Sequence, residues 1–441
     1  MHGDHSRVTF QEAKHYSSVI HQQGRAFLDA DANEQSAILL HAMRSLTRDM
    51  LGAHGVPALS DAALSSNGFR IELAVASRGF DIGAGAYYVD GIRCVNDEPA
   101  AAYYGQPHYV VNQSDDPLPV GEFLVYLDVW ERHITSLDDP LLRETALGGP
   151  DSCTRSQIVW QVKVAEVPAA APLSDPPLPE EIARLIQGRL PTELPTMRAR
   201  VRPGDVSTTP CVMPPSGGFR GQENQLYRVE VHTGGLAGAA TFKWSRDNGS
   251  VVFPVTDVGA DSVTVLHLGM DPTRSIVAGD WVELLDDEAI LKIGRGRLAR
   301  VKQVDDSRVV QLELVGGGAL ATPNGRRNSF LRRWDHRGAR PVDGATVITE
   351  SNQLNDGWLD LEDGVQVQFA VAGRTYVSGD YWTIAARTGT GQIEWPTTAV
   401  GPALLPPAGI AHHYAPLAMV NGGTIDRFRR IVTMTAQPET P

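Results

Sequence analysis

The sequence is poor in cysteine and lacks long hydrophobic runs. Its 441 residues include three cysteines, Cys94, Cys153 and Cys211, with no Cys-x-x-Cys pair. This sparse, odd set predicts free thiols rather than a disulfide framework or a zinc site. No stretch reaches the roughly 20 apolar residues of a membrane-spanning helix. The N-terminus has neither the basic region nor the apolar core of a signal peptide. We therefore expect synthesis in the cytoplasm and no membrane span.

Positive charge is also scarce. The 39 Lys and Arg residues are outnumbered by 52 Asp and Glu residues, which gives a net charge of −13. Because nucleic-acid binding depends on cations that displace phosphate counterions, we expect no nucleic-acid partner. With 42% hydrophobic and 21% charged residues, the chain has the composition of a folded protein. Its 43 Gly and 29 Pro residues predict many turns between short strands.

Motifs that identify a reaction are missing. The sequence has no Walker loop, no His-Glu-x-x-His and no Gly-x-Ser-x-Gly. The acidic run Asp286–Glu288 lacks the spacing of a calcium loop and is predicted to lie in a solvated turn. His412 and His413 would point to opposite faces of a strand, so they cannot chelate one metal together. Asp335 and His336 are interpreted as part of a structural ion pair. We expect no catalytic residue, no metal and no cofactor.

The strongest helical signal lies near the start. Asp31–Glu34 has the form of a capping box, and Gly52 supplies a C-terminal stop. Between them, mainly apolar residues recur in alternating steps of four and three, namely Ala32, Ser36, Leu39, Met43, Leu46 and Met50. This seam either packs on the core of the chain or bundles around a symmetry axis in an oligomer. In the second case Leu39, Met43, Leu46 and Met50 form the oligomer or docking interface.

Strand patterns follow the helix. The first set contains a hairpin around Asp90-Gly91 and a strand, Phe123–Trp130, whose continuous apolar run predicts burial on both faces. In Leu226–His232, alternation places Arg228, Glu230 and His232 on one face. Asn248-Gly249 predicts a hairpin between the strands on either side of it.

These patterns predict a mainly β fold: an N-terminal helix followed by β-sandwich or barrel-like domains, with a small SH3-like barrel inserted. The predicted parts are 1–52 (N-terminal segment and helix), 53–165 (first β domain), 166–220 (Pro-rich linker and wrap), 221–436 (second β region, immunoglobulin-like, with the SH3-like insertion at about 277–316) and 437–441 (tail).

Several literal runs resemble a bacterial family known only as a domain of unknown function. The runs span residues 21–35, 126–132, 146–151, 223–230, 242–250 and 379–382, and the first reads HQQGRAFLDADANEQ. The similarity extends over nearly the whole chain. One departure is Ala32, where members of the family typically carry Trp.

Members of that family tend to be encoded among components of phage-tail-like contractile injection systems. The resemblance implies a structural part of such a particle, at the baseplate or in an attached fibre or spike, with other particle subunits as partners. It also implies a homo-oligomer, with a trimer favoured, because fibre-like parts are commonly trimeric. Such a particle can be released from the cell after assembly. The resemblance carries over no catalytic residue.

Two other functions stay open at this stage. A surface-recognition module would bind glycan or cell envelope, its target-surface ligand, through exposed aromatics such as Trp244, Trp281, Trp334 or Trp382, although strand tryptophans usually belong to a core. A cell-wall hydrolase would need a cleft with clustered acids, for which Asp335, His336 and Asp363 are the candidates.

Overall fold

The structure is a computed structural model of the whole chain. It describes residues 2–57, 67–73, 79–108, 117–169, 172–188, 192–204, 217–269, 271–292, 295–320, 328–337, 343–421 and 424–432. The fold is mainly β, with 40% strand and 13% helix, which confirms the predicted fold class. The predicted tail, 437–441, and Cys211 lie outside the described residues.

The chain forms two compact units, and each unit is assembled from several segments. The helix unit comprises residues 9–132, 156–192 and 411–441. The barrel unit comprises residues 1–8, 133–155 and 193–410. Each predicted domain is one continuous stretch of the sequence. In the structure, by contrast, each unit is built from three separate segments.

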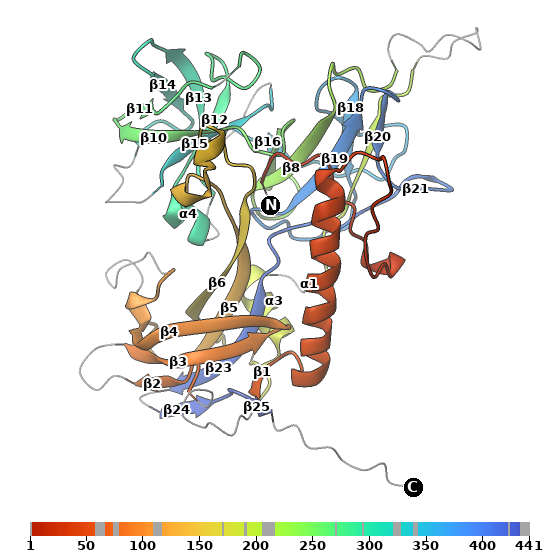
Figure 1. The fold of residues 1–441 in the computed structure, drawn as a ribbon. Helices are drawn as coiled ribbons and strands as arrows, with labels where there is room; N and C mark the ends of the chain where they lie inside the picture. Colours follow the sequence, from red (N-terminus) through yellow and green to blue (C-terminus); the bar gives the residue numbers. More distant parts are fainter. Residues whose placement is uncertain are drawn as a thin grey trace. The chain divides into compact units, whose positions relative to one another are not determined.

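The helix unit combines one long helix with two sheets (Figure 1). Its helical elements are η1 (Glu12–Lys14), α1 (Asp29–Leu51), η2 (Tyr103–Gly105) and α3 (Pro179–Gln187). The first sheet has the order β2-β3-β1-β25, with β4 also paired to β3; these strands are β1 (His54–Pro57), β2 (Ile71–Leu73), β3 (Phe80–Val89), β4 (Ile92–Ala102) and β25 (Ile431–Val432). The second has the order β24-β23-β5-β6: β5 (Phe123–Ile134), β6 (Arg155–Glu166), β23 (His413–Asn421) and β24 (Thr424–Arg427).

One hydrophobic core joins the two sheets of the helix unit. Phe80 and Tyr87 of β3 meet Val125 of β5 and Trp160 of β6 in this core, and all four are buried. The opposite face of β5 is also buried, because α3 covers it through Ile182. Burial on both faces explains the continuous apolar run in β5 and confirms that prediction.

A long hairpin, β3–β4, forms as the sequence predicts. Asp90 and Gly91 both have positive φ, 48° and 79°, and they connect Val89 to its partner Ile92. Positive φ at both central residues is the requirement of the two-residue turn that matches strand twist. The Asp-Gly pair meets this requirement, and the hairpin is confirmed.

The barrel unit contains a closed barrel with the strand order β10-β11-β14-β13-β12-β15. Its strands are β10 (Val252–Val258), β11 (Ser262–Val265), β12 (Trp281–Leu285), β13 (Arg297–Val304), β14 (Val309–Leu314) and β15 (Phe330–Trp334), with α4 (Asp287–Leu291) after β12. The predicted insertion at 277–316 therefore covers three of the six strands. The other three, β10, β11 and β15, lie outside the predicted range.

Two further sheets of the barrel unit share a core and form a sandwich. The larger has the order β16-β9-β8-β19-β20: β8 (Gln225–Thr233), β9 (Thr241–Ser245), β16 (Thr346–Val347), β19 (Tyr381–Arg387) and β20 (Gln392–Glu394). The smaller has the order β17-β18-β7: β7 (Met197–Val201), β17 (Leu359–Asp360) and β18 (Val365–Phe369). The remaining elements are η3 (Pro140–Leu142), η4 (Thr145–Leu147), β21 (Thr397–Thr398) and β22 (Gly401–Pro402).

The predicted hairpin at Asn248-Gly249 is wrong, although the turn itself exists. Asn248 and Gly249 have positive φ, 50° and 65°. However, β9 pairs with β8 and β16, whereas β10 pairs with β11 and β15 of the barrel. The turn therefore carries the chain from the sandwich into the barrel and does not join two paired strands.

Candidate functional site: the exposed face of α1

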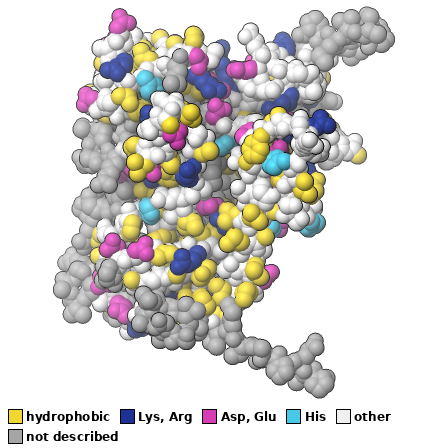
Figure 2. All heavy atoms as spheres, in the orientation of Figure 1, with side chains coloured by type: hydrophobic (Ala, Val, Ile, Leu, Met, Phe, Trp, Pro, Cys, Tyr) yellow, Lys and Arg dark blue, Asp and Glu magenta, His cyan; other side chains and the backbone are white. Residues whose placement is uncertain are grey.

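Helix α1 carries a row of large apolar side chains that the chain itself leaves uncovered. Leu39, Met43, Leu46 and Met50 are 56%, 67%, 61% and 51% exposed, respectively. Figure 2 shows hydrophobic side chains along the part of the surface where α1 lies. We call these four residues the α1 stripe. Their steps of four, three and four keep them on one side of the helix over about three turns.

The other side of α1 packs on the helix unit. Ala30, Ile38 and Leu51 are buried there. Arg44 forms an ion pair of 2.9 Å with Glu131 of β5. The four residues of the α1 stripe are not among the buried residues of the helix. The hypothesis that the stripe packs on the core of its own chain is therefore wrong.

The turn of the β3–β4 hairpin fixes the helix at its C-terminal half. Arg48 lies 3.2 Å from Asp90 in an ion pair. Gly91 lies so close to the helix that a Cβ there would be less than 3.0 Å from the carbonyl oxygen of Arg44. The helix then ends at Leu51, where the N–H of Gly52 donates to the Arg48 carbonyl at 2.8 Å. The predicted stop at Gly52 is confirmed.

The predicted capping box is wrong, because α1 begins at Asp29 with Leu28 as its N-cap, three residues before the predicted N-cap at Asp31. Glu34 does not return to the helix start. Its carboxylate accepts from the hydroxyl of Thr9 at 2.6 Å. Gln35 likewise accepts from the backbone N–H of Val19 at 2.7 Å. The segment before α1 is thus tied to the first turns of the helix.

That segment adds further exposed apolar side chains. Ile20 and Phe27 are 83% and 69% exposed, and Leu28 is 44% exposed. The three residues line an open cavity of about 520 Å³, and Asp31 is also part of its lining. Large exposed apolar side chains are thus present both on this segment and on the α1 stripe, and exposed apolar patches are typical of protein interaction sites.

A second feature is a cluster of charged side chains between the sandwich and the outside of the barrel. Lys243 of β9 donates to Glu283 of β12 at 2.5 Å and lies 3.3 Å from Glu230 of β8. Arg228 donates to Glu230 at 2.5 Å. Although burial acts to raise it, Arg228 and Lys243 hold the pKa of Glu230 well below its usual range. The carboxylates are therefore ionised, and the sequence alternation that placed Arg228, Glu230 and His232 together is confirmed.

The first residues of the chain cover this charged cluster. His2 Nε2 lies 2.9 Å from the Glu230 carboxylate, and the side-chain amide of Asn248 donates to the Gly3 carbonyl at 2.9 Å. Burial, with help from Arg228, lowers the pKa of His2 well below its usual value. His2 is therefore neutral at pH 7, as is His232, whose pKa burial lowers to about 4.

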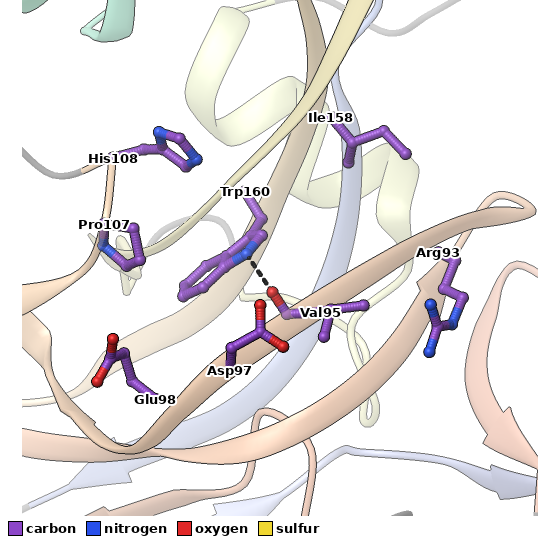
Figure 3. A pocket seen from close by; sticks show the side chains of 8 residues that line it. All are labelled: Arg93, Val95, Asp97, Glu98, Pro107, His108, Ile158 and Trp160. Carbon is purple, nitrogen blue, oxygen red and sulfur yellow. Dashed lines mark hydrogen bonds between the residues drawn. The ribbon is translucent and has the colours of Figure 1, made fainter.

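A small pocket lies on the helix unit between β4 and β6 (Figure 3). Its volume is about 320 Å³, and the residues that line it are Arg93, Val95, Asp97, Glu98, Pro107, His108, Ile158 and Trp160. The Trp160 indole N–H donates to the Val95 carbonyl at 2.8 Å, and Trp160 is only 5% exposed. The indole N–H is thus already bonded within the protein. The charged side chains that line the pocket, Arg93, Asp97 and Glu98, carry both signs of charge.

The tryptophans considered for glycan binding belong mostly to the interior. Trp244, Trp334 and Trp382 are 3%, 1% and 2% exposed, so their interpretation as exposed binding residues is wrong. Trp281 is half-buried and stacks on His336 with ring centroids 5.2 Å apart. Trp244, Trp334 and Trp382 lie on strands and point into the protein interior, so they are not available at the surface for a glycan.

The candidate acids and histidines are engaged in structural contacts. Asp335 accepts from the backbone N–H of Arg246 at 2.9 Å and faces two arginines, as the ion-pair interpretation predicts. His336 is buried and bonds the Gly344 carbonyl at 2.9 Å instead. His412 and His413 bind different carboxylates, Asp128 and Asp90.

The remaining candidate groups show no reactive arrangement. Asp286 caps α4 by accepting from the Ala289 N–H at 2.9 Å, so the acidic run is not merely solvated. Cys94 and Cys153 are free thiols. Among the described residues, no group of three or more His, Cys, Asp or Glu side chains is placed to hold a metal ion. Within the same residues, no helix is long and apolar enough to cross a membrane.

Comparison with known proteins gives one match. A family of unknown function, DUF6519, matches residues 1–175 and 177–434. The chain belongs to DUF6519. No curated protein and no solved structure matches it. The match to DUF6519 extends through α1, its preceding segment and both units, so the α1 stripe lies in a family region rather than in an appendage.

Proposed function

We propose that this DUF6519 chain is a non-enzymatic structural and interaction subunit of a phage-tail-like contractile injection particle. We further propose that copies of the chain associate through the α1 stripe. The observation that carries the proposal is the row of four large apolar side chains, each more than half exposed, at heptad spacing on a helix of 23 residues. The resemblance of residues 21–35 and the other runs supports the particle as the setting.

The spacing favours a second copy of α1 as the partner of the stripe. Steps of three and four keep two or three parallel helices in contact along a common seam. Ala32 and Ser36 continue the seam toward the start of α1 with small side chains, which let helices approach closely. The positions that flank the seam are almost all uncharged, namely Asn33, Gln35, Leu40, Ala42, Thr47 and Asp49. A parallel copy therefore meets little repulsion, since charge at such positions sets partner choice.

The apolar area at stake is sufficient to drive association. Complete burial of a Leu or Met side chain contributes about 1.5–3 kcal/mol. Because each stripe residue is 51–67% exposed, the four together can contribute about 3.5–7 kcal/mol per copy on that scale. Three copies around one axis would share this gain, in keeping with the trimer that the resemblance implies.

Site-specific cross-linking tests the association. In a parallel, in-register bundle, Met43 of one copy faces Met43 of the next. We expect Met43→Cys, in a Cys153→Ala, Cys211→Ala background, to form an interchain disulfide under mild oxidation. Leu147→Cys in the same background is the matched control, because Leu147 is 70% exposed but lies in the barrel unit. Equal cross-linking of the two variants would contradict association through α1.

Occupancy in purified particles tests the setting. We expect the wild type and Leu147→Lys to co-purify with particles from the producing strain, and Leu46→Lys to be depleted from them by at least tenfold. Full occupancy of the Leu46→Lys variant would contradict docking through the stripe. Absence of the wild type from particles would contradict the particle as its setting.

A further inference from the structure

The first residues of the chain form a strap on the barrel unit. Residues 2–7, which we call the N-terminal strap, belong to this unit, whereas the chain from residue 9 onward belongs to the helix unit. Hydrogen bonds and ion pairs hold the strap along its length, namely Asn248 to the Gly3 carbonyl at 2.9 Å, Arg274 to Asp4 at 3.3 Å, Arg387 to the Ser6 carbonyl at 3.1 Å and Arg7 to Glu394 at 3.2 Å. Exposed ion pairs of this kind add little to stability. Docking of the strap therefore depends on the inward contact that its first side chain, His2, makes.

His2 reaches into the charged cluster of the barrel unit. Its Nε2 lies 2.9 Å from the Glu230 carboxylate, and its side chain is 21% exposed. Because the ionised carboxylate can only accept, the neutral imidazole carries its proton on Nε2 and donates it to Glu230. The ring stands edge-on to that of Trp334, with centroids 6.3 Å apart. On its other flank, a Cβ at Gly249 would lie 2.7 Å from the ring, so that position has no room for a side chain while His2 is docked.

The carboxylate that His2 contacts already has two cations. Arg228 lies 2.5 Å from Oε2 of Glu230, and Lys243 lies 3.3 Å from Oε1. His2 donates to Oε2 as well, the same oxygen that Arg228 occupies. A protonated His2 would therefore be a third cation on one carboxylate. Burial of a cation that has no counter-charge of its own is costly.

Further charged and titratable groups surround this contact. They lie on β8, β12, β15, the strap, the end of β5 and the segment after β5, namely His232, Glu283, Arg332, Asp4, His5, His133 and Asp138. Glu283 and Asp138 both act on Arg332 and offset part of its charge. His232 and His133 are neutral at pH 7, because burial lowers their pKa values to about 4 and about 3.

The docked strap opposes protonation of His2. Burial, Arg228 and Arg332 outweigh the effect of Glu230 and hold the pKa of His2 well below its usual value. In a released strap the imidazole is solvated and regains an ordinary pKa of about 6.5. Because the released state then binds the proton more readily than the docked state, acid favours release. The docked state keeps its full advantage above about pH 6.5 and loses up to about tenfold of it for each pH unit below.

We propose that the N-terminal strap is an acid-released latch of the barrel unit, in which protonation of His2 frees residues 2–7. The device has two states: a docked strap with a neutral His2, and a released strap with a protonated one. Release withdraws the imidazole from Glu230 and opens this part of the charged cluster to solvent. The latch lies within the barrel unit and does not rest on the proposed function.

The mobility of a spin label on the strap tests the proposal in the full chain. Ser6→Cys, in a Cys153→Ala, Cys211→Ala background, carries the label at an exposed position of the strap. Electron paramagnetic resonance should show a restricted label at pH 7.5, and the ratio of mobile to restricted signal should rise by up to about tenfold per pH unit below about pH 6.5. A label at Leu147→Cys, exposed in the same unit but outside the strap, should keep one line shape while circular dichroism reports an intact fold. A strap label that stays restricted down to pH 5 would overturn the latch.

Substitution of His2 decides whether its side chain is the latch. His2→Gln keeps a neutral, polar side chain at every pH, so its strap label should be restricted at pH 7.5 and at pH 5 alike. His5→Gln, at the other histidine of the strap, is the matched control and should keep the acid response. An acid response that persists in His2→Gln, or disappears in His5→Gln, would overturn the assignment to His2. If the label of His2→Gln is already mobile at pH 7.5, His2→Asn takes its place; mobility of both at pH 7.5 would also overturn the proposal, because a neutral residue 2 would then not hold the strap.

Discussion

Replacement of Gly91 by alanine probes the attachment of α1 to the helix unit. Gly91 has a φ of 79°, in the left-handed region, where a residue with a side chain costs about 1–2 kcal/mol. Its new Cβ would also come within 3.0 Å of the Arg44 carbonyl oxygen, and the neighbouring helix backbone cannot rotate away. Overpacking of this kind costs about 1–3 kcal/mol. We therefore expect Gly91→Ala to lower the free energy of unfolding by about 2–5 kcal/mol.

Gly188→Ala separates the two contributions. Gly188 belongs to the same unit and has a similar φ of 68°, but a Cβ there meets nothing within 4 Å. This control should lose only the backbone contribution, about 1–2 kcal/mol. Urea unfolding followed by far-UV circular dichroism measures both variants against the wild type. If Gly91→Ala costs no more than Gly188→Ala, the close packing of the hairpin turn against α1 is refuted.

Three further substitutions test the buried charges by chemical denaturation. Lys243→Met leaves Glu230 and Glu283 without their shared cation and should lower the free energy of unfolding by about 3–5 kcal/mol. Lys302→Met, at an exposed position of the same unit, should cost almost nothing, and similar losses in the two variants would contradict the pairing. Burial raises the pKa of Glu362 to about 7, so the folded chain holds a proton that the unfolded chain releases near pH 4.5. The free energy of unfolding should therefore fall by up to about 3 kcal/mol as pH rises from about 4.5 to 7. Glu362→Gln should flatten this fall, and an unchanged pH profile in the variant would refute the raised pKa of Glu362. Burial lowers the pKa of His54 to about 4, so stability should fall as pH decreases from about 6.5 to 4, and His54→Gln should reduce that loss; equal acid sensitivity would count against the neutral, buried imidazole.

Features that depend on a few neighbouring residues could be predicted from the sequence. Asp90-Gly91 forms its turn because both residues tolerate positive φ, and no distant contact is needed for that choice. Gly52 ends α1 for a similar local reason. Continuous apolar character likewise predicted that β5 is buried on both faces.

Features that depend on distant partners could not be predicted in the same way. α1 starts three residues before the predicted N-cap, and the Glu34 carboxylate that the predicted box would have used accepts instead from Thr9, 25 residues earlier in the chain. The turn at Asn248-Gly249 was predicted, but the strands on either side of it do not pair with each other: β9 pairs with β8 and with the distant β16, and β10 pairs with β11 and with the distant β15. For the same reason the heptad spacing of α1 could not show which side faces outward. That side is set by the contact of Arg44 with Glu131, 87 residues later.

The charged cluster shows a further limit. Alternation placed Arg228, Glu230 and His232 on one face, which suggested a solvated surface as readily as a buried one. Burial arises because the barrel, inserted after β9, brings Glu283 against this face.

The mass of the chain in solution tests the central claim most directly. Sedimentation equilibrium or light scattering at micromolar concentration should give a multiple of 47.7 kDa for the wild type, with three times that mass favoured. The double variant Leu39→Lys, Leu46→Lys should sediment as a monomer. The control Leu141→Lys, Leu147→Lys, which alters exposed leucines of the barrel unit, should keep the mass of the wild type. A monomeric wild type, or an oligomer that survives the two α1 substitutions, would contradict association through the α1 stripe.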